Sequence, residues 1–319
     1  MHIDHHLYHL KPFHALNAHH QGDHRLGALL RVNFGEGIIG YADCHPWPEI
    51  GDLPLETQLY RLKHGIPTNL ARCSIRFAHL DALARQKRQP LLSPRNIPKS
   101  HYLITNLLSW TEGDLHQAIK QGYTHVKLKL GRKLEEEINQ ILGLFSQGAL
   151  KVRLDFNEAL TYDSFQAFLR KIAPLQPHID FIEDPFPFHA KQWEQVQKQG
   201  WILACDRHAV HASHHPEAAQ VLVIKPAIQP KEDWTNWTQQ RRVVTSYLDH
   251  PFGQLTAAYV ASLVDPQRKE VHGLLTHHAY HLNAFSHKLS PPGPDFKVPE
   301  GVGFGFESEL ETLSWKSLT

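Results

Sequence analysis

Residues 124–131 read Thr-His-Val-Lys-Leu-Lys-Leu-Gly, so that polar and apolar side chains alternate. This alternation is typical of a β-strand with one face against a core, and it places Lys127 and Lys129 on the same face of the strand. Charged side chains are rarely buried unless they are paired. If these lysines point into the fold, they need partners or a function.

The strand belongs to a series of short apolar segments that alternate with amphipathic helices from about residue 101 onward. We expect eight strands, at 101–106, 124–129, 151–155, 179–183, 202–206, 221–225, 242–246 and 271–275. A helix-sized segment follows each of the first seven. Repeated βα units give parallel strands, and eight of them can close into a barrel. The sequence therefore predicts an α/β fold with a TIM-like barrel over residues 99–289.

The first part of the chain has a different pattern. It predicts strands at 2–10, 25–34 and 38–44, a tight turn at 35–37, and helices near 55–63 and 69–88. Three prolines between residues 90 and 98 then indicate a linker. We expect a small α+β domain over residues 1–98, with the loop-rich segment 290–319 folded back against it.

The composition excludes several classes of function. The 33 Lys and Arg residues nearly balance the 32 Asp and Glu residues, so no general attraction to nucleic acid or anionic membranes is expected. Cys44, Cys73 and Cys205 are few and distant, which favours reduced thiols. The chain shows no signal-peptide pattern and no apolar run of membrane-spanning length. We expect a cytoplasmic protein without membrane or nucleic-acid partners, and the sequence leaves its oligomeric state open.

Histidine is frequent, with 26 residues, and many of them lie near the start of the chain, including His5-His6 and His19-His20. A metal-scavenging tract is one interpretation of this segment. The histidines lack a repeated ligand spacing, however, so we favour ordinary polar surface positions.

Charged residues end five consecutive predicted strands. Catalytic groups of such barrels lie at the carboxyl ends of the strands. Because side chains alternate between the two faces of a strand, every second residue points toward the barrel axis. The charged residues in these positions are Lys127, Lys129, Arg153, Asp155, Glu183, Asp206 and Lys225. Asn157, just after the third strand, is in step with them. The intervening residues are apolar and would face the helices.

The three carboxylates Asp155, Glu183 and Asp206 end neighbouring strands. Such groups repel one another unless a cation lies between them. Because all the donors are hard oxygens, the set favours Mg²⁺, with Mn²⁺ as a second possibility. Lys129 and Lys225 lie four strands apart in a ring of eight, and would therefore face each other across this site.

This set of residues suits the removal of a proton next to a carboxylate. A bound cation stabilises the enediolate that forms when the α-proton leaves. A lysine beside other positive charges has a lowered pKa and can act as the base, and Lys127 and Arg153 could supply such charge. The competing interpretation is structural, with Lys129 paired to Asp155 and Lys225 to Asp206. It does not explain the matching parity on five strands.

These residues resemble the enolase superfamily in its muconate-lactonizing-enzyme-like branch and, within it, the o-succinylbenzoate synthases. The matching stretches are Lys-x-Lys at 127–129, Val-Arg-Leu-Asp-Phe-Asn at 152–157, Ile-Glu-Asp-Pro-Phe at 182–186, Asp206 and Val-Ile-Lys-Pro at 223–226. The loop at 40–52 and the segment 272–280 are also similar to that family.

The resemblance implies a capping domain over a (β/α)7β barrel, with Mg²⁺ held by the three carboxylates. It implies that Lys129 is the base, that Lys225 stabilises the enediolate as a cation, and that Arg153 supports the catalytic lysine. Asn157, Ser246 and Gly273 would contact a small carboxylate substrate. The implied reaction is the syn dehydration of 2-succinyl-6-hydroxy-2,4-cyclohexadiene-1-carboxylate to o-succinylbenzoate, a step of menaquinone biosynthesis.

The chain also departs from this family. It has Asp206-Arg207-His208 where many relatives have Asp-Glu-Ser, and only Thr245-Ser246 remain of a serine-rich segment. Racemisation of N-acylamino acids is an alternative, because two opposed lysines suit it equally, and cycloisomerisation is a weaker one. The Asp-x-Asp of dipeptide epimerases is absent from 273–278. A catalytically silent barrel that binds a metal or a partner is the alternative of another class, although no lysine or carboxylate of the set is missing.

Overall fold

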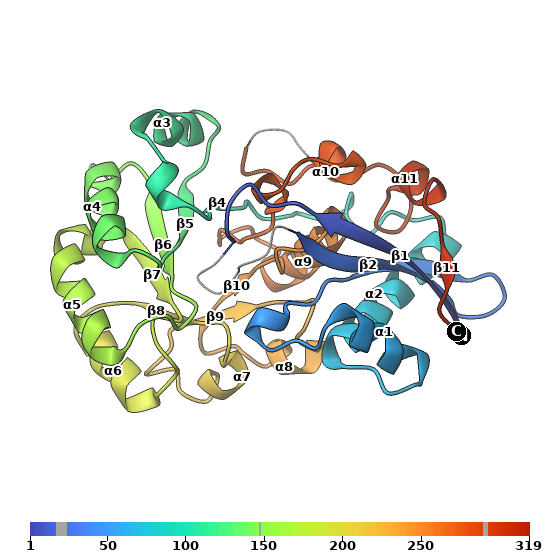
Figure 1. The fold of residues 1–319 in the computed structure, drawn as a ribbon, viewed down its shortest axis with the longest axis horizontal. Helices are drawn as coiled ribbons and strands as arrows, with labels where there is room; N and C mark the ends of the chain where they lie inside the picture. The colour runs from blue at the N-terminus through green and yellow to red at the C-terminus, as the bar shows by residue number, and fades with distance from the viewer. Residues whose placement is uncertain (17–23, 147, 290–292) are drawn as a thin grey trace.

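The computed structural model of the chain describes residues 1–16, 24–146, 148–289 and 293–319. A curled parallel sheet forms its larger part, in the order β10-β9-β8-β7-β6-β5-β4 (Figure 1). The strands are β4 (Tyr102–Ile104), β5 (His125–Lys129), β6 (Lys151–Asp155), β7 (Ile179–Glu183), β8 (Leu203–Cys205), β9 (Val221–Ile224) and β10 (Arg241–Val244). Alternating apolar side chains on the outer face of this sheet pack against helices, as the sequence pattern predicts.

A helix follows each of these seven strands, which confirms the predicted βα alternation. The helices are α3 (Glu112–Lys120), α4 (Leu134–Phe145), α5 (Tyr162–Ile172), α6 (Ala190–Lys198), α7 (Ala209–Ala212), α8 (Lys231–Thr235) and α9 (Pro251–Val264). Short 3-10 helices are η1 (Pro48–Ile50), η2 (Leu107–Ser109), η3 (Ala173–His178) and η4 (His277–Ala279). Helices α3 to α6 form the outer layer on the left of Figure 1.

The predicted eighth strand, 271–275, is not a regular strand. It forms single parallel bridges at Ser100–His272 and Thr245–Gly273, and so joins the two edges of the sheet. Side chains add further hydrogen bonds: the His272 ring accepts from Val244 N of β10 at 2.8 Å, and Ser100 Oγ accepts from two backbone amides of the segment at 3.0 Å. The segment closes the barrel because the backbone of His272 and Gly273 bonds both edges of the sheet, whereas the next two amides bond the Ser100 side chain and end the ladder.

A second, antiparallel sheet has the order β11-β1-β2-β3. Its strands are β1 (His2–Leu10), β2 (Arg25–Asn33), β3 (Ile39–Cys44) and β11 (Lys316–Ser317), and helices α1 (Leu55–Lys63) and α2 (Asn69–Gln86) pack on it. The predicted turn joins β2 to β3, with Gly35, Glu36 and Gly37 all at positive φ. We call this sheet with α1 and α2 the cap.

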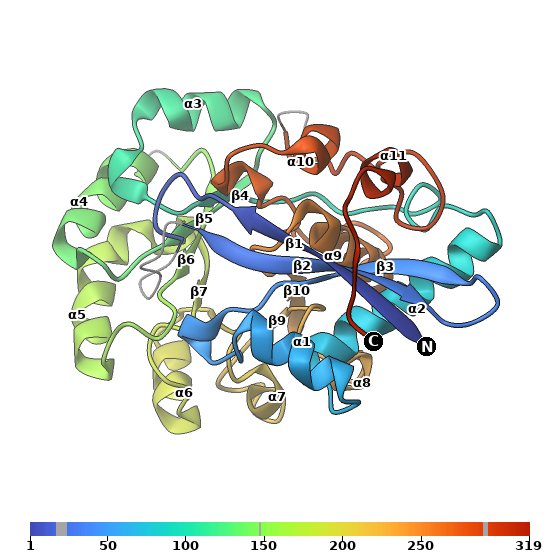
Figure 2. The ribbon, with the colours of Figure 1, turned by 45° about the vertical axis from the view of Figure 1, so that its right-hand side comes forward.

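The two ends of the chain lie side by side in the cap (Figure 2). Leu318 N donates to Ile3 O at 2.8 Å, and Ile3 N donates to Thr319 Oγ1 at 2.9 Å. Helices α10 (Ala284–Leu289) and α11 (Glu307–Glu311) precede β11. Phe304 N also donates to the buried carboxylate of Asp81 on α2, at 2.7 Å. The last part of the chain is therefore attached to the cap at several points.

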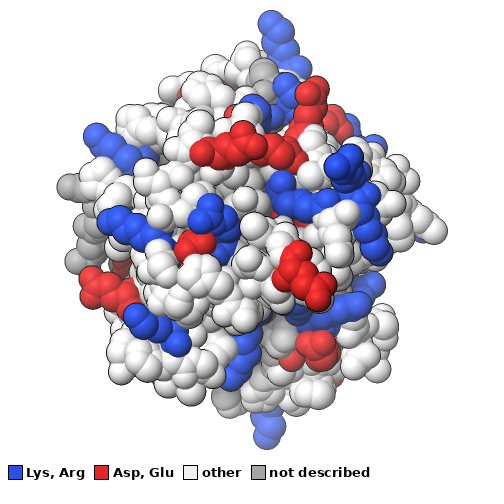
Figure 3. All heavy atoms as spheres, turned by 90° about the vertical axis from the view of Figure 1, so that its right-hand side faces the viewer, with Lys and Arg blue, Asp and Glu red and all other residues white. Residues whose placement is uncertain are grey.

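The surface agrees with the balanced composition. Basic and acidic side chains are intermixed on the face in Figure 3. Within the described residues, no helix combines the length and apolar character that a membrane crossing requires. The thiols of Cys44, Cys73 and Cys205 are free and buried. Of the N-terminal histidines, His2 bonds Asp4 and His6 bonds a backbone carbonyl, whereas His19-His20 lie outside the described residues.

Two buried carboxylates face each other where the cap meets the barrel. A Cβ built on Gly253 would lie 2.6 Å from Oδ2 of both Asp43 and Asp249, so the two groups flank this glycine closely. The hydroxyl of Tyr8 donates to Asp43 at 2.6 Å, and His250 N donates to it at 3.1 Å. Burial raises the pKa of Asp249 to about 7, and burial together with Asp249 raises the pKa of Asp43 well above its usual range.

We expect this pair to make the free energy of unfolding fall as the pH rises. The folded-state pKa of Asp249 lies above its unfolded value, so its contribution is fully present below about pH 4 and is lost as the pH rises through about 7. Asp249→Asn removes the contribution of Asp249, while Asp43 keeps its own, and should stabilise the protein by about 2 kcal/mol at pH 8 relative to its effect at pH 5. Urea unfolding of both proteins between pH 5 and 8.5 measures this.

The exposed Asp163 offers a matched control, since Asp163→Asn changes a carboxylate on the surface of α5. This variant should keep the wild-type pH profile. A wild-type profile in Asp249→Asn as well would contradict the contribution assigned to Asp249.

Candidate active site

The register of the central strands brings the predicted carboxylates to one place. Lys129 pairs with Asp155, and Asp155 pairs with Glu183 on the next strand. Glu183 pairs with Ala204, so Asp206, two residues further on, projects to the same side. All three carboxylates are buried, with exposed fractions of 0% for Asp155, 1% for Glu183 and 5% for Asp206. The alternation of residues along these strands predicts that the three carboxylates lie together.

Lysine ammonium groups lie among these carboxylates. Lys127 Nζ is 2.8 Å from Asp155 and 2.7 Å from Glu183. Lys129 Nζ is 2.6 Å from Asp155 and donates to Asn157 Oδ1 at 3.2 Å. The Lys225 ammonium group pairs with Asp206. The pairs Lys129–Asp155 and Lys225–Asp206 of the structural interpretation are thus present, and they belong to one continuous cluster.

The pKa values in this cluster depend on burial and on the neighbouring charges. Burial, together with Lys127 and Lys225, lowers the pKa of Lys129 despite the nearby Asp155. Burial opposes the charge on Lys127 as well, but Asp155 and Glu183 raise its pKa above the ordinary value. Burial and the charge of Asp155 raise the pKa of Glu183 to about 7. Of the two lysines of β5, Lys129 is therefore the one that loses its proton more readily.

The donor chemistry of the cluster fits a divalent cation. Among the described residues, no three His, Cys, Asp or Glu side chains surround one point as a ready metal site. The positive charges that the three carboxylates require come instead from the lysine ammonium groups. Because one ammonium group contacts both Asp155 and Glu183, these two carboxylates are near neighbours. With Asp206 they form an all-oxygen set of the kind that Mg²⁺ and Mn²⁺ prefer.

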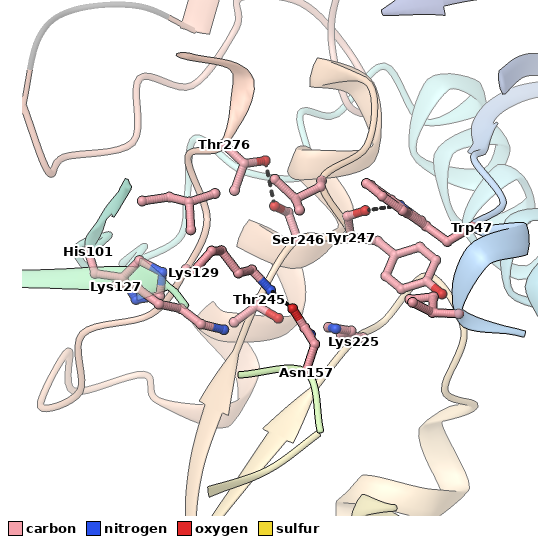
Figure 4. A pocket seen from close by; sticks show the side chains of 14 residues that line it. Trp47, His101, Lys127, Lys129, Asn157, Lys225, Thr245, Ser246, Tyr247 and Thr276 are labelled. Carbon is pink, nitrogen blue, oxygen red and sulfur yellow. Dashed lines mark hydrogen bonds between the residues drawn. The ribbon is translucent and has the colours of Figure 1, made fainter. Parts of the chain in front are cut away.

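A pocket opens above the lysines (Figure 4). The space inside it, about 490 Å³, is partly open to solvent. The lining residues are Trp47, Ile50, His101, Leu103, Lys127, Lys129, Asn157, Lys225, Thr245, Ser246, Tyr247, Leu248, Gly273 and Thr276. The structure thus places all three residues predicted to bind substrate, Asn157, Ser246 and Gly273, in its wall.

The cap supplies one side of the pocket. Trp47 Nε1 donates to Tyr247 O at 2.8 Å, and the Tyr247 hydroxyl donates to Asp52 at 3.0 Å. The guanidinium of Arg25 packs on the Trp47 ring, 3.8 Å from its centre. Sequence reasoning did not find Trp47, Asp52 and Tyr247, because they lie on loops without periodicity. The one signal was a tryptophan inside the proline-rich loop 46–52.

Asp184, one residue out of parity, holds the end of the neighbouring strand. Its carboxylate accepts from Asp206 N and from Arg207 N, each at 3.1 Å. Arg207 and His208, where the chain departs from the family pattern, both contact Glu158, at 3.0 and 3.2 Å. Arg207 and His208 therefore change the charges near Asp206, but the hydrogen bond from Asp206 N to Asp184 is still present.

Among the described residues, the Arg153 guanidinium bonds groups other than Lys129, and its predicted support of that lysine stays a prediction. Its guanidinium bonds Asp180 at 2.7 Å and Glu270 at 2.8 Å, and it lies 4.7 Å from the Phe181 ring centre. Asp180 stands at the start of β7, so this ion-pair network lies toward the amino ends of the strands. Parity places Arg153 inside the barrel, but its long side chain turns away from the carboxyl ends.

Comparisons with known proteins agree with this geometry. A family model described as the N-terminal domain of o-succinylbenzoate synthase matches residues 3–84, and one described as enolase C-terminal domain-like matches residues 112–312. The chain is 34% identical to an o-succinylbenzoate synthase of Bdellovibrio bacteriovorus, over 98% of this chain and 97% of that protein.

Solved structures share the fold at lower identity. A dipeptide epimerase from Cytophaga hutchinsonii, complexed with Mg and D-Ala-L-Val, has a TM-score of 0.79 at 15% identity, over 100% of this chain and 99% of that one. A muconate lactonizing enzyme from Mycobacterium smegmatis, complexed with muconolactone, has a TM-score of 0.77 at 15% identity, over 98% of both chains. The chain therefore belongs to the enolase superfamily, in the muconate-lactonizing-enzyme-like branch that includes the o-succinylbenzoate synthases.

Proposed function

We propose that this protein is an o-succinylbenzoate synthase of menaquinone biosynthesis, acting in the cytoplasm. It would dehydrate 2-succinyl-6-hydroxy-2,4-cyclohexadiene-1-carboxylate to o-succinylbenzoate. The observation that carries the proposal is that Lys129 and Lys225 line one pocket, next to a cluster of three buried carboxylates. The relative from Bdellovibrio and the matching N-terminal domain support this reaction over others of the superfamily.

Lys129 is the proposed base. Its pKa is lowered, so its amino group can take the proton at the carbon that bears the ring carboxylate. The resulting ammonium group returns this proton to the hydroxyl group on the same face of the ring, which leaves as water while the ring becomes aromatic. Asn157, 3.2 Å from Lys129 Nζ, orients the amine. Lys127 keeps its proton and supplies constant positive charge.

Lys225 is proposed to act from the other side of the pocket. Asp206 raises its pKa against the effect of burial, so it stays protonated and can stabilise the negative charge that develops on the substrate carboxylate. A divalent cation held by Asp155, Glu183 and Asp206 would add positive charge at the same substrate oxygens. The role of Lys225 as a fixed cation fits dehydration, which needs one base.

Racemisation of N-acylamino acids is the second candidate, because opposed lysines could serve both faces of a substrate. Dehydration is tested by incubating the purified protein with Mg²⁺ and the cyclohexadiene substrate. The change in the ultraviolet absorbance of the ring measures its rate. Polarimetry with N-succinyl-L-amino acids tests the second. We expect dehydration to exceed racemisation by at least about tenfold in kcat/KM. Racemisation without dehydration would refute the proposal.

A further inference from the structure

Three loops meet beside the carboxylate cluster, and each begins directly after one of its strands. Residues 156–160 follow β6, residues 184–186 follow β7, and residues 206–208 follow β8. Asn157, Glu158 and Asp184 all have positive φ angles, of 49°, 63° and 40°. Such angles are uncommon for residues other than glycine, and they persist where the surrounding structure holds the backbone in place. Contacts between these loops are therefore needed to keep their conformation.

Hydrogen bonds join the three loops in a closed circuit. Glu158 N donates to Asp184 O at 2.7 Å. The Asp184 carboxylate accepts from Asp206 N and from Arg207 N, each at 3.1 Å. Arg207 Nη1 then donates to Glu158 Oε2 at 3.0 Å, and His208 Nε2 lies 3.2 Å from the other oxygen of this carboxylate. The circuit thus returns to the residue at which it began, and the Glu158 side chain links the first loop to the third.

This circuit lies next to the groups that would hold a cation. Asp155 and Glu183 end the strands that lead into the first two loops, and Asp206 is the first residue of the third loop. A shift of one loop against another would therefore change the distances between these carboxylates. The Glu158 and Arg207 side chains are only 12% and 26% exposed, so water screens their ion pair less than a fully exposed pair.

The first loop also reaches into the pocket. Asn157 lines the pocket, and its Oδ1 accepts from Lys129 Nζ at 3.2 Å (Figure 4). The next residue, Glu158, directs its carboxylate to Arg207, and both of these side chains line a groove outside the pocket. The ion pair thus holds from outside a loop whose inner side contacts the proposed base.

We propose that Glu158 and Arg207 are positioning residues of the metal site, whose ion pair sets the separation of Asp155 and Asp206 and thereby the affinity for the divalent cation. This inference rests on the proposed function, of which the cation is part. Groups that orient the ligands of a metal strengthen its binding without touching it. The pair carries no net charge, so it can fix the loops without changing the total charge beside the cluster.

Binding of Mn²⁺ to the protein without substrate tests this pair, because electron paramagnetic resonance measures free Mn²⁺ and gives the Kd. Residues that acted through charge alone would give opposite results: loss of the Glu158 charge would weaken the binding of a nearby cation, and loss of the Arg207 charge would strengthen it. We expect Glu158→Gln and Arg207→Gln each to weaken Mn²⁺ binding by about tenfold. The double variant should bind no more weakly than either single variant, because each substitution already removes the same ion pair.

Two further variants serve as controls. Arg207→Lys keeps a positive charge for Glu158 and should stay within about threefold of the wild type. Lys171→Gln breaks the exposed pair of Lys171 with Glu135, between α5 and α4, and should bind Mn²⁺ like the wild type. Thermal unfolding verifies that each variant is folded.

Tighter Mn²⁺ binding in Arg207→Gln would overturn the inference, as would wild-type affinity in both Glu158→Gln and Arg207→Gln. A loss of thermal stability with unchanged Mn²⁺ affinity would mean that the pair is merely structural. If the wild-type protein binds no Mn²⁺, the proposed metal-dependent function fails together with the inference.

Discussion

Lys129→Ala is expected to lower kcat for dehydration by at least about a thousandfold, while the protein stays folded. A positioned general base contributes roughly 10²–10⁴ in rate, and alanine also removes the group that returns the proton to the leaving hydroxyl. The fold should survive because Lys127 still neutralises Asp155, at 2.8 Å. Steady-state kinetics give the rate, and circular dichroism with thermal unfolding verifies the fold.

Lys129→Arg separates basicity from charge. Arginine keeps the positive charge beside Asp155, but its pKa is too high for a base near neutral pH, so this variant should be as inactive as alanine. Lys120→Ala, at the exposed end of α3, is the control and should keep full activity. Activity of Lys129→Ala within about tenfold of wild type, or ~1.4 kcal/mol of barrier, would mean that another group is the base.

Removal of divalent metal is expected to abolish turnover, and added Mg²⁺ or Mn²⁺ should restore it. Three buried carboxylates from adjacent strands provide the oxygen ligands, and without the cation the substrate carboxylate would lose most of its charge stabilisation. Dialysis against a chelator, followed by assays with and without metal, gives the residual rate. We expect less than about 1% of the original activity, on the scale of a lost electrostatic stabiliser.

A binding measurement tests the same carboxylates without catalysis. Mg²⁺ at a hundred times its Kd should raise the free energy of unfolding of the wild type by about 2.7 kcal/mol. Glu183→Gln should lose most of this gain, whereas the surface variant Lys120→Ala should retain it. Full turnover in protein shown by elemental analysis to be metal-free would contradict the metal-dependent mechanism.

Much of this fold is predictable from the sequence because it depends on local alternation. Strand and helix periods predict the seven βα units, and the alternation along the strands predicts that Asp155, Glu183 and Asp206 share one side. The segment 271–275 is shorter as a strand than predicted, because the amides of Leu274 and Leu275 bond the side chain of Ser100. A hydrophobic pattern contains no information about such bonds.

The rest of the site depends on contacts between distant parts of the chain. Trp47 reaches the pocket from the cap, 200 residues before the carbonyl of Tyr247 that its indole binds. Arg153 has the right parity, but the direction of its guanidinium depends on Asp180 and Glu270. None of these relations has a period or a motif that marks it in the sequence.

The loop 46–52 belongs to the cap, yet it forms part of the pocket wall. All the proposed proton-transfer groups lie on the barrel, whereas the cap contributes Trp47 and Ile50 to the same pocket. Changes in this loop can therefore reshape the cavity while the lysines and carboxylates stay as they are. Substitutions among these seven residues are therefore expected to change which substrates fit the pocket and to leave the proton-transfer groups unchanged.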